Sequence, residues 1–286
     1  MRAKNNVVLI WTLVVLLGLG SVFIWNTLLL QNKSDVLTVT FFDVGQGDGI
    51  FIETPNGTKV LIDGGKGKQI LRSLGNELSF FERDIDMVIA THPDLDHIGG
   101  LPHVFERYNI ISFLHSGVED GGADNQALLS AVAFEGISTE NVEHKNSYVL
   151  DEDVYLEILF PDRPANMLEA NTGSVVLKVT YRETSFLLTG DSPAGIESYL
   201  VSLYGKNLKS TVLKLGHHGS KTSSTLMFLG YVDPTYAVIS ASCDNSYGHP
   251  HKEVLDRLEV LDIEELSTCK HGDVVFESDG KEVYVK

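Results

Sequence analysis

The chain has 286 residues, 43% of them hydrophobic, which suits one sizeable core and argues against a disordered protein. All 39 Asp and Glu residues lie beyond residue 34, together with 19 of the 22 Lys and Arg residues, so this portion carries a net charge of −20. Such a surface repels nucleic-acid phosphates at long range, which argues against a broad electrostatic DNA-binding face. Any nucleic-acid chemistry would need a local site with bound cations.

The N-terminus carries a run of 24 residues without a charge, from Val7 to Leu30. About 20 apolar residues form a helix that crosses ~30 Å of hydrocarbon, so we expect one membrane-spanning signal anchor. A cleaved signal peptide, which would leave the protein secreted, is the alternative, but its apolar region is usually about 7–15 residues long. Arg2 and Lys4 precede the run, and the positive-inside bias then places the N-terminus in the cytoplasm. Residues 1–34 would form the anchor and a short joint, and residues 35–286 an extracytoplasmic domain.

The domain alternates strand-like and helix-like segments, which predicts the α/β class. Pro55-Asn56-Gly57 is a hairpin turn signal between two strand-like runs. The expected strands cover residues 37–44, 49–53, 59–62, 85–90, 110–115, 154–160, 175–181, 185–189, 211–215, 236–241, 265–269, 274–277 and 282–285. The expected helices cover residues 69–78, 102–108, 127–134, 193–204, 223–229 and 252–261. This order is compatible with two sheets packed together and covered by helices, an αββα sandwich.

The strongest chemical signal directly follows an apolar strand. It consists of four ligand-type side chains within six residues, His92, Asp94, Asp96 and His97. A solvated loop has no need for this pattern, and imidazole together with carboxylate suits Zn, Mn or Fe ions. Asp96 and His97 adjoin, so their side chains can point to two different ions. We therefore predict a metal-binding centre at these four residues.

Three further polar clusters follow expected strands, at Thr189-Gly190-Asp191, Gly216-His217-His218-Gly219 and Tyr247-Gly248-His249. Each is weak alone, because a lone His or Asp is more often a surface or core residue than a ligand. The ends of parallel strands share one edge of a sheet, so the clusters together predict one composite site. The histidines without a motif are expected to be structural or surface residues: His103, His115, His144 and His271.

The two cysteines, Cys243 and Cys269, are too few for a zinc ribbon, which needs four ligands at short spacing. In an oxidising compartment they would form one disulfide. Otherwise they are two unrelated buried thiols, and the residues leave both interpretations open.

These segments resemble the metallo-β-lactamase superfamily, whose usual His-x-His-x-Asp-His signature is here His92-x-Asp94-x-Asp96-His97. The resemblance is closer to the β-lactamase-like domain of ComEC-type competence proteins, which act in DNA uptake, and it covers about residues 36–286. It also rests on Phe42-Asp43-Val44-Gly45-Gln46-Gly47-Asp48, Leu61-Ile62-Asp63-Gly64-Gly65, Leu188-Thr189-Gly190-Asp191, Lys214-x-x-His217-His218-Gly219-Ser220 and Tyr247-Gly248-His249-Pro250-His251. It does not include the multi-helix channel of those proteins, so a channel would be a separate partner.

The resemblance implies a site for two divalent metal ions, Mn or Zn, with a bridging hydroxide as the nucleophile. His92 and Asp94 would hold the first ion, Asp96 and His97 the second, and Asp191 would bridge the two. Asp94 replaces the usual His, which makes the donor set harder and shifts the expectation from Zn toward Mn.

The other implied roles lie around these ligands. One of His217 and His218 would complete the second ion, with a preference for His218. His249 would either bind a metal or contact the substrate, and Lys214 would either neutralise substrate charge or be an ordinary strand-end lysine. With Asp96, these last two are the candidate catalytic residues. Three carboxylates would support the ligand loops from outside the metal shell: Asp43, Asp48 and Asp63.

These roles predict a membrane-anchored, extracytoplasmic, metal-dependent hydrolase, a phosphodiesterase or nuclease that acts on DNA or another phosphodiester. The same centre is compatible with hydrolysis of an ester, thioester or lactam, because a fold does not choose its substrate. A third hypothesis is a non-catalytic membrane assembly or binding component that keeps the metal site for stability.

Overall fold

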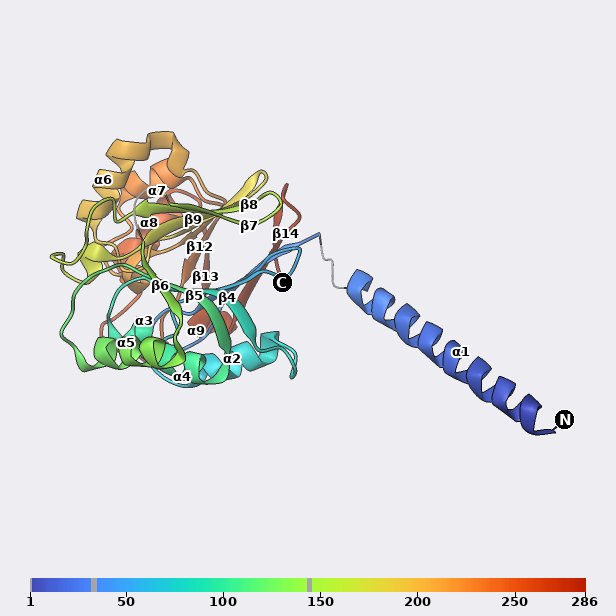
Figure 1. Cartoon of the computed structure of the whole chain (residues 1–286). Coiled ribbons are helices and arrows are strands. Elements are labelled where there is room, and N and C mark those ends of the chain that lie inside the picture. Colours follow the sequence, from blue (N-terminus) through green and yellow to red (C-terminus); the bar gives the residue numbers. More distant parts are fainter. Residues whose placement is uncertain (1, 32–34, 143–145) are drawn as a thin grey trace.

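The computed structural model describes residues 2–31, 35–142 and 146–286 (Figure 1). Its first element is helix α1 (Arg2–Gln31), which covers the charge-free run, and the side chains at positions 10–25 are exposed. By length and hydropathy, no helix among the described residues qualifies as a membrane span. The predicted joint at residues 32–34 and His144 lie outside the described residues.

Within the described chain, the first sheet has eight strands in the order β15-β14-β1-β2-β3-β4-β5-β6. The bounds are β1 (Leu37–Phe41), β2 (Ile50–Glu53), β3 (Lys59–Ile62), β4 (Asp84–Ala90), β5 (Asn109–His115), β6 (Ser138–Asn141), β14 (Val274–Ser278) and β15 (Val283–Val285). The first strands pair antiparallel through the predicted hairpin between β2 and β3. From β3 to β6 the strands run parallel.

The second sheet has the order β13-β12-β11-β10-β9-β8-β7 over the same described ranges. Its strands are β7 (Ser147–Asp151), β8 (Val154–Phe160), β9 (Val176–Tyr181), β10 (Thr184–Leu188), β11 (Val212–Lys214), β12 (Tyr236–Ile239) and β13 (Glu264–Ser267). Strands β10 to β13 run parallel. Each sheet therefore presents a set of parallel strand ends, and the loops that leave these ends carry the polar clusters.

Apart from α1, the longer helices lie on the outer faces of the two sheets, one set toward the top and one toward the bottom of Figure 1. The bounds are α2 (Gln69–Glu77), α3 (Leu95–Ile98), α4 (Leu101–Arg107), α5 (Ala123–Glu135), α6 (Ala194–Tyr204), α7 (Leu226–Val232), α8 (Lys252–Val260) and α9 (Thr268–His271). Successive side chains of β2 point to opposite faces of the sheet. Ile50 and Ile52 therefore pack in the core between the two sheets, whereas Phe51 packs in the core that the first sheet forms with α2, α4 and α5. A third core lies beneath α6, α7 and α8. The arrangement agrees with the predicted αββα sandwich.

The structure differs from the predicted elements mainly where apolar alternation is weak. Strands β6 and β7 were not predicted, and β6 has the polar sequence Ser-Thr-Glu-Asn with every side chain exposed. Helices α3 and α9 were also not predicted, and α9 contains positions 268–269, which were expected to end a strand. Each of these two helices has four residues, too short for a helical hydrophobic period to be visible.

Candidate metal centre

The predicted ligands come from loops at the ends of strands of both sheets. His92 to His97 follow β4, and Asp96 and His97 lie on the short helix α3. Asp191 follows β10, and His217 and His218 follow β11, so the second sheet supplies the other ligand-type groups. Strands far apart in sequence thus bring their end loops to one place, as predicted, but these strands belong to two sheets and do not share one edge of a single sheet.

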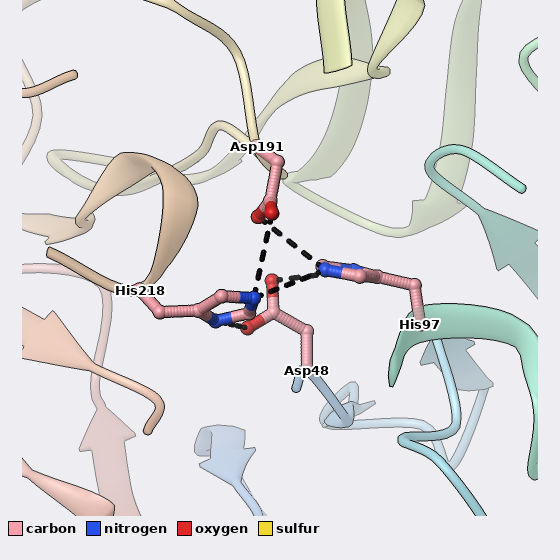
Figure 2. Close-up of side chains that lie close together, drawn as sticks. All are labelled: Asp48, His97, Asp191 and His218. Carbon is pink, nitrogen blue, oxygen red and sulfur yellow. Dashed lines mark hydrogen bonds and ion pairs between the residues drawn. The ribbon is translucent and has the colours of Figure 1, made fainter. Parts of the chain in front are cut away.

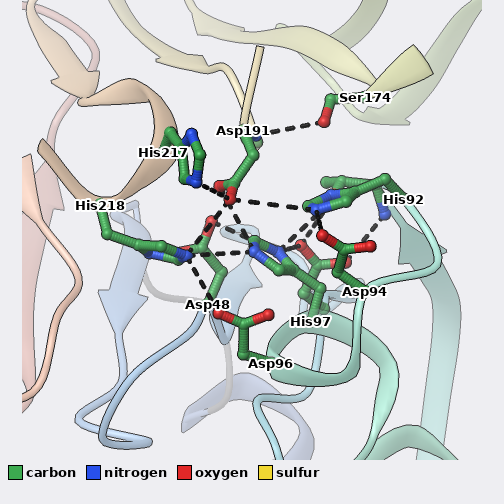
Figure 3. Close-up of polar contacts among 12 residues, drawn as sticks. Asp48, His92, Asp94, Asp96, His97, Ser174, Asp191, His217 and His218 are labelled. Carbon is green, nitrogen blue, oxygen red and sulfur yellow. Dashed lines mark hydrogen bonds and ion pairs between the residues drawn. The ribbon is translucent and has the colours of Figure 1, made fainter. Parts of the chain in front are cut away.

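We call the tighter of two clusters the inner group; it consists of His97 Nε2, His218 Nε2, Asp96 Oδ2 and the Asp191 carboxylate (Figure 3). The two imidazole nitrogens are 3.3 Å apart. His97 Nε2 lies 3.3 Å from Asp191 Oδ1, and His218 Nε2 lies 3.4 Å from both Asp191 Oδ2 and Asp96 Oδ2. These are the residues implied for the second ion, with His218 as the added imidazole.

The second cluster, called the outer group, lies on the other side of the Asp191 carboxylate and consists of His92 Nε2, Asp94 Oδ2, His217 Nε2 and Asp191 Oδ2 (Figure 3). His92 Nε2 is 3.6 Å from Asp94 Oδ2 and 4.0 Å from Asp191 Oδ2. His217 Nε2 is 3.7 Å from Asp191 Oδ2. Asp191 is therefore shared by both groups. His217 and His218 are divided between the groups, whereas the adjacent Asp96 and His97 both belong to the inner group and do not point to two different ions.

Hydrogen bonds at the far nitrogens hold three of the imidazoles in one orientation. His97 Nδ1 donates to Asp63 Oδ2 at 2.7 Å, and His218 Nδ1 donates to the Ser240 carbonyl at 2.8 Å. Thr91 Oγ1 donates to Asp63 and lies 3.0 Å from His92 Nδ1, from which it can accept. With each Nδ1 carrying the proton, each Nε2 keeps a lone pair directed toward Asp191.

Thr91 and Ser240 were not among the predicted site residues. Thr91 directly precedes His92, and a hydroxyl at that strand end was the only sequence signal for it. Ser240 contributes its backbone carbonyl, and because every residue has one, no residue type predicts this contact.

Unusual backbone conformations bring these groups together. His217 and His218 both have positive φ angles, 50° and 55°, as does Asp63 at 58°. Two successive left-handed residues are uncommon outside glycine and tend to occur at functional sites. Gly47 permits a close approach, since a Cβ at this position would collide with the carbonyl oxygen of Asp96.

Asp48 is fully buried beside the inner group (Figure 2). It joins His97, Asp191 and His218 in a set whose ligand atoms lie within 4.8 Å of one another. However, Asp48 Oδ2 pairs with the Lys214 ammonium, and Asp48 Oδ1 is 3.5 Å from His218 Nδ1, the nitrogen turned away from Asp191. We therefore place Asp48 outside the ligand shell, as a partner of Lys214 and His218.

The position of Lys214 excludes the first of its two predicted roles, which was to neutralise the charge of a substrate by contact. Its side chain is fully buried, pairs with Asp48, and donates to the Gly190 carbonyl at 3.1 Å. Its Nζ is 3.7 Å from Asp191 Oδ1. Because no part of this side chain reaches solvent, Lys214 neutralises charge inside the protein and does not contact a substrate.

The remaining predicted residues lie farther out. His249 is half-buried, its ring centroid is 5.5 Å from that of His217, and its Nδ1 is buried without a hydrogen-bond partner among the described residues. Asp43 accepts from the Gly45 N–H at 3.2 Å, and its own N–H donates to Asp273, so its described contacts shape the loop after β1. Cys243 and Cys269 form a disulfide with Cα atoms 5.0 Å apart, which decides between the two alternatives left by the sequence.

Burial and mutual charge shift the pKa values of the centre in opposite directions. Burial alone would raise the pKa of Asp191, but the His218 and His97 imidazoles outweigh it and hold that pKa well below its usual range. Burial would likewise lower the pKa values of His97 and His218, yet Asp191 raises both well above their usual range. Burial lowers the pKa of His249 to about 4, with the charges of His217 and His218 acting in the same direction.

The chemistry of the donor set suits divalent metal ions. A four-coordinate ion with bonds of about 2.0–2.2 Å holds its ligand atoms roughly 3.3–3.6 Å apart. The inner group has spacings of 3.3 and 3.4 Å, whereas those of the outer group are wider, at 3.6, 3.7 and 4.0 Å. Within residues 35–142 and 146–286, His92 Nε2 and Asp191 Oδ1 are buried without a hydrogen-bond partner, which is costly unless another ligand satisfies them. His92, Asp94, His217 and Asp191 would hold one ion, and the inner group would hold the other.

Comparisons with known proteins agree with this geometry. The metallo-beta-lactamase superfamily matches residues 42–243. The chain is 31% identical over 255 residues to ComE operon protein 3 of Bacillus subtilis and 33% identical over 239 residues to competence protein ComA of Neisseria gonorrhoeae. Each alignment covers 83% of this chain but 32% of the relative, so the chain spans about a third of the length of these curated relatives.

Among solved structures, the diiron β-hydroxylase CmlA from Streptomyces venezuelae has a TM-score of 0.54 and 14% sequence identity, covering 81% of this chain and 53% of that one. At this identity the likeness concerns the fold alone. The fold, the superfamily match over residues 42–243 and the similarity to the competence proteins lead to the same result: the chain belongs to the metallo-beta-lactamase superfamily, as a ComEC-like domain.

Proposed function

We propose that the protein is a metal-dependent hydrolase that cleaves phosphodiester bonds, with DNA as its substrate. The observation that carries this proposal is the shared position of Asp191 between two groups of ligand atoms. Two divalent ions held in this way supply a nucleophile at neutral pH and stabilise the charge that develops on a phosphodiester. The similarity to competence proteins supports DNA as the substrate class.

The chain's own residues would position these reactants. Asp63, Ser240 and Thr91 keep the imidazole Nε2 atoms directed inward. The buried Lys214 ammonium offsets the negative charge of Asp48, with which it pairs, and lies 3.7 Å from Asp191 Oδ1. His249 has a pKa of about 4 and is therefore neutral near pH 7. Its Nδ1 is buried, so we assign to the exposed part of this half-buried ring a contact with the substrate. Asp94, an oxygen donor, favours Mn²⁺ over Zn²⁺ in the outer group.

The test uses the full chain, purified in a mild detergent, stripped of metal and reloaded with Mn²⁺ or Zn²⁺. We expect hydrolysis of a labelled oligonucleotide and of bis(p-nitrophenyl) phosphate with Mn²⁺ present, and loss of both in Asp96→Ala. The matched control is Asp124→Ala, an exposed carboxylate on α5, which should retain activity. A metal-loaded protein that cleaves neither phosphodiester would refute the proposal. Turnover of nitrocefin or a thioester, without cleavage of a phosphodiester, would favour the alternative substrate classes. No turnover of any substrate would favour a binding role.

Membrane attachment is a separate part of the proposal. The charge-free run from Val7 to Leu30 would anchor the chain with its N-terminus in the cytoplasm and the hydrolase domain outside. The Cys243–Cys269 disulfide supports this location, because disulfides persist in oxidising compartments. The full chain should stay with membranes through alkaline carbonate extraction and be digested by protease added outside intact cells. Release by carbonate would refute the anchor, and protection from protease would refute the orientation.

A further inference from the structure

A polar groove opens directly beside the inner group. It has a volume of about 320 Å³ and is lined by Gln46, Lys66, Leu95, Asp96, Ser242 and residues 244–247. Asp96 connects it to the metal centre, since its Oδ2 is 3.4 Å from His218 Nε2. The volume lies at the lower end of the range for small-ligand sites, about 300–1,000 Å³, so it suits one building block of a larger substrate.

Tyr247 gives this groove an exposed aromatic wall. Its side chain is 65% exposed, yet its ring stacks on His249 with centroids 5.6 Å apart and an interplanar angle of 23°. A large aromatic ring held in place but open to solvent, in the wall of a groove, is the usual platform for an unpaired nucleic-acid base.

The loop that carries Tyr247 is held in a fixed shape. The Asn245 side-chain amide donates to the Ser242 carbonyl at 2.8 Å and to the His249 carbonyl at 2.6 Å, and the His249 N–H donates back to Asn245 Oδ1 at 2.9 Å. The Ser242 N–H also donates to Gln46 Oε1 at 3.4 Å, which links this loop to the loop after β1. Such preorganisation lowers the entropy lost when a ligand binds.

Lys66 supplies a cation to the lining of the groove. It is exposed, and no carboxylate of residues 35–142 or 146–286 lies within ion-pair distance of it. On a domain with a net charge of −20, an unpaired ammonium beside the centre is a local attraction for a phosphate. Asp244 also lines the groove, so the phosphate is expected on the Lys66 side.

One of the larger cavities among the described residues lacks these features. It has a volume of about 680 Å³ and is lined by residues 116–117, 119, 141–142 and 162–166, none of which is aromatic. Its one cation, Arg163, is already paired with Asp162. This cavity has neither a stacking ring nor a free cation for a nucleotide.

We propose that the groove beside Asp96 binds one unstacked nucleotide next to the bond that is cut, with Tyr247 stacked on its base and Lys66 against a flanking phosphate. The inference rests on the proposed phosphodiesterase function and adds the residues that select a polynucleotide. It requires a base outside the duplex stack, so a single strand fits the groove better than a duplex.

The experiment measures kcat and KM of the full chain with Mn²⁺ on a single-stranded oligonucleotide, its duplex and bis(p-nitrophenyl) phosphate. Tyr247→Ala should lower kcat/KM on the single strand about tenfold, mainly through KM, which is the range expected for loss of one base–aromatic stack. The loss on bis(p-nitrophenyl) phosphate should be several-fold smaller, because that substrate has no base to place in the groove. Tyr247→Phe keeps the ring and should restore the oligonucleotide kinetics.

The matched control is Tyr231→Ala, which removes an exposed tyrosine of α7 that does not line the groove and should change neither substrate's kinetics. Lys66→Gln should raise KM for the oligonucleotide. It should also lower the slope of log KM against log salt by about the amount that one phosphate contact contributes. Equal losses of Tyr247→Ala on both substrates, no loss on either, or faster cleavage of the duplex would overturn the groove assignment while leaving the phosphodiesterase proposal intact. A wild-type chain that cleaves no phosphodiester would overturn both.

Discussion

At the scale of single residues, the centre is a balance of buried charges. Asp48, Asp63 and Asp191 are buried together with His97, His218 and the Lys214 ammonium. Burial would raise the pKa of Asp48, but Lys214 and His97 outweigh it and keep that pKa well below its usual range. Burial would lower the pKa of Lys214, and Asp48 and Asp191 raise it. Each charged form is therefore maintained by its neighbours, and the loss of one member leaves another uncompensated.

The first prediction concerns Lys214. Lys214→Met should destabilise the metal-free protein by about 3–5 kcal/mol, because Asp48 would remain buried without its cation. The double variant Lys214→Met with Asp48→Asn should recover part of that loss, since no unpaired charge is left. Denaturant unfolding measures both, with the exposed lysine variant Lys281→Met as the control. Additive losses in the double variant would show that the two side chains do not act as a pair.

The second prediction concerns pH. Asp191 raises the pKa values of His97 and His218 well above their usual range, so this pair of imidazoles in the metal-free protein holds protons more tightly than free imidazoles do. A metal must displace these protons, so its affinity should rise as pH rises from about 6 to 8, by up to about tenfold per pH unit for each proton released. Titration calorimetry in buffers of different ionisation enthalpy counts the protons. An affinity independent of pH would contradict this assignment of charge.

At the scale of elements, the site depends on loops that are fastened at several points. The loop after β12 carries His249 and Tyr247, and the Cys243–Cys269 disulfide joins its start to α9. The loop after β1 is fastened to α3, because the Asp48 N–H donates to the Asp96 carbonyl at 3.2 Å. Short elements such as α3 and α9 therefore act as attachment points more than as units of the core.

The third prediction concerns the disulfide. It closes a loop of 26 residues, for which the loss of unfolded-state entropy gives a stabilisation of about 3.5 kcal/mol. Replacing both cysteines with alanine should lower the free energy of unfolding by roughly that amount. It should also raise KM for an oligonucleotide more than for a small phosphodiester, because the groove wall loses its fixed position. Unchanged stability after both replacements would mean that the bridge does not constrain the chain.

At the scale of the whole molecule, the metal centre connects the two sheets. His92 to His97 belong to loops of the first sheet, and Asp191, His217 and His218 belong to loops of the second. Both proposed groups contain residues from both sheets, so bound ions would cross-link the layers in addition to the apolar core between them.

The fourth prediction follows from this cross-link. Ligands that bind only the folded state stabilise it by about 2.7 kcal/mol per site when present at 100 times their Kd. Removing metal with a chelator should therefore lower the Tm by roughly 5 °C or more for each ion lost. Calorimetry with and without Mn²⁺ measures this, and Asp191→Ala should abolish the shift. A Tm that does not change when metal is removed would show that the ions do not join the sheets.

The amino-acid sequence by itself determined the local features of this protein. Apolar alternation placed most strands and helices, and the clusters at strand ends predicted which residues gather, since both signals lie within short stretches of chain. It did not reveal β6, whose residues are all exposed and polar. This edge strand forms by pairing with its neighbour β5 and has no apolar alternation of its own.

Only the tertiary structure decided which partners meet. His97 and His218 are 121 positions apart, and the assignment of His218 to one group and His217 to the other depends on two left-handed backbone conformations. The pairing of Lys214 with Asp48, the disulfide and the groove at Tyr247 likewise join distant segments. Local sequence patterns report the period and chemistry of a segment, whereas these contacts depend on how the two sheets pack, which places distant side chains in one buried space.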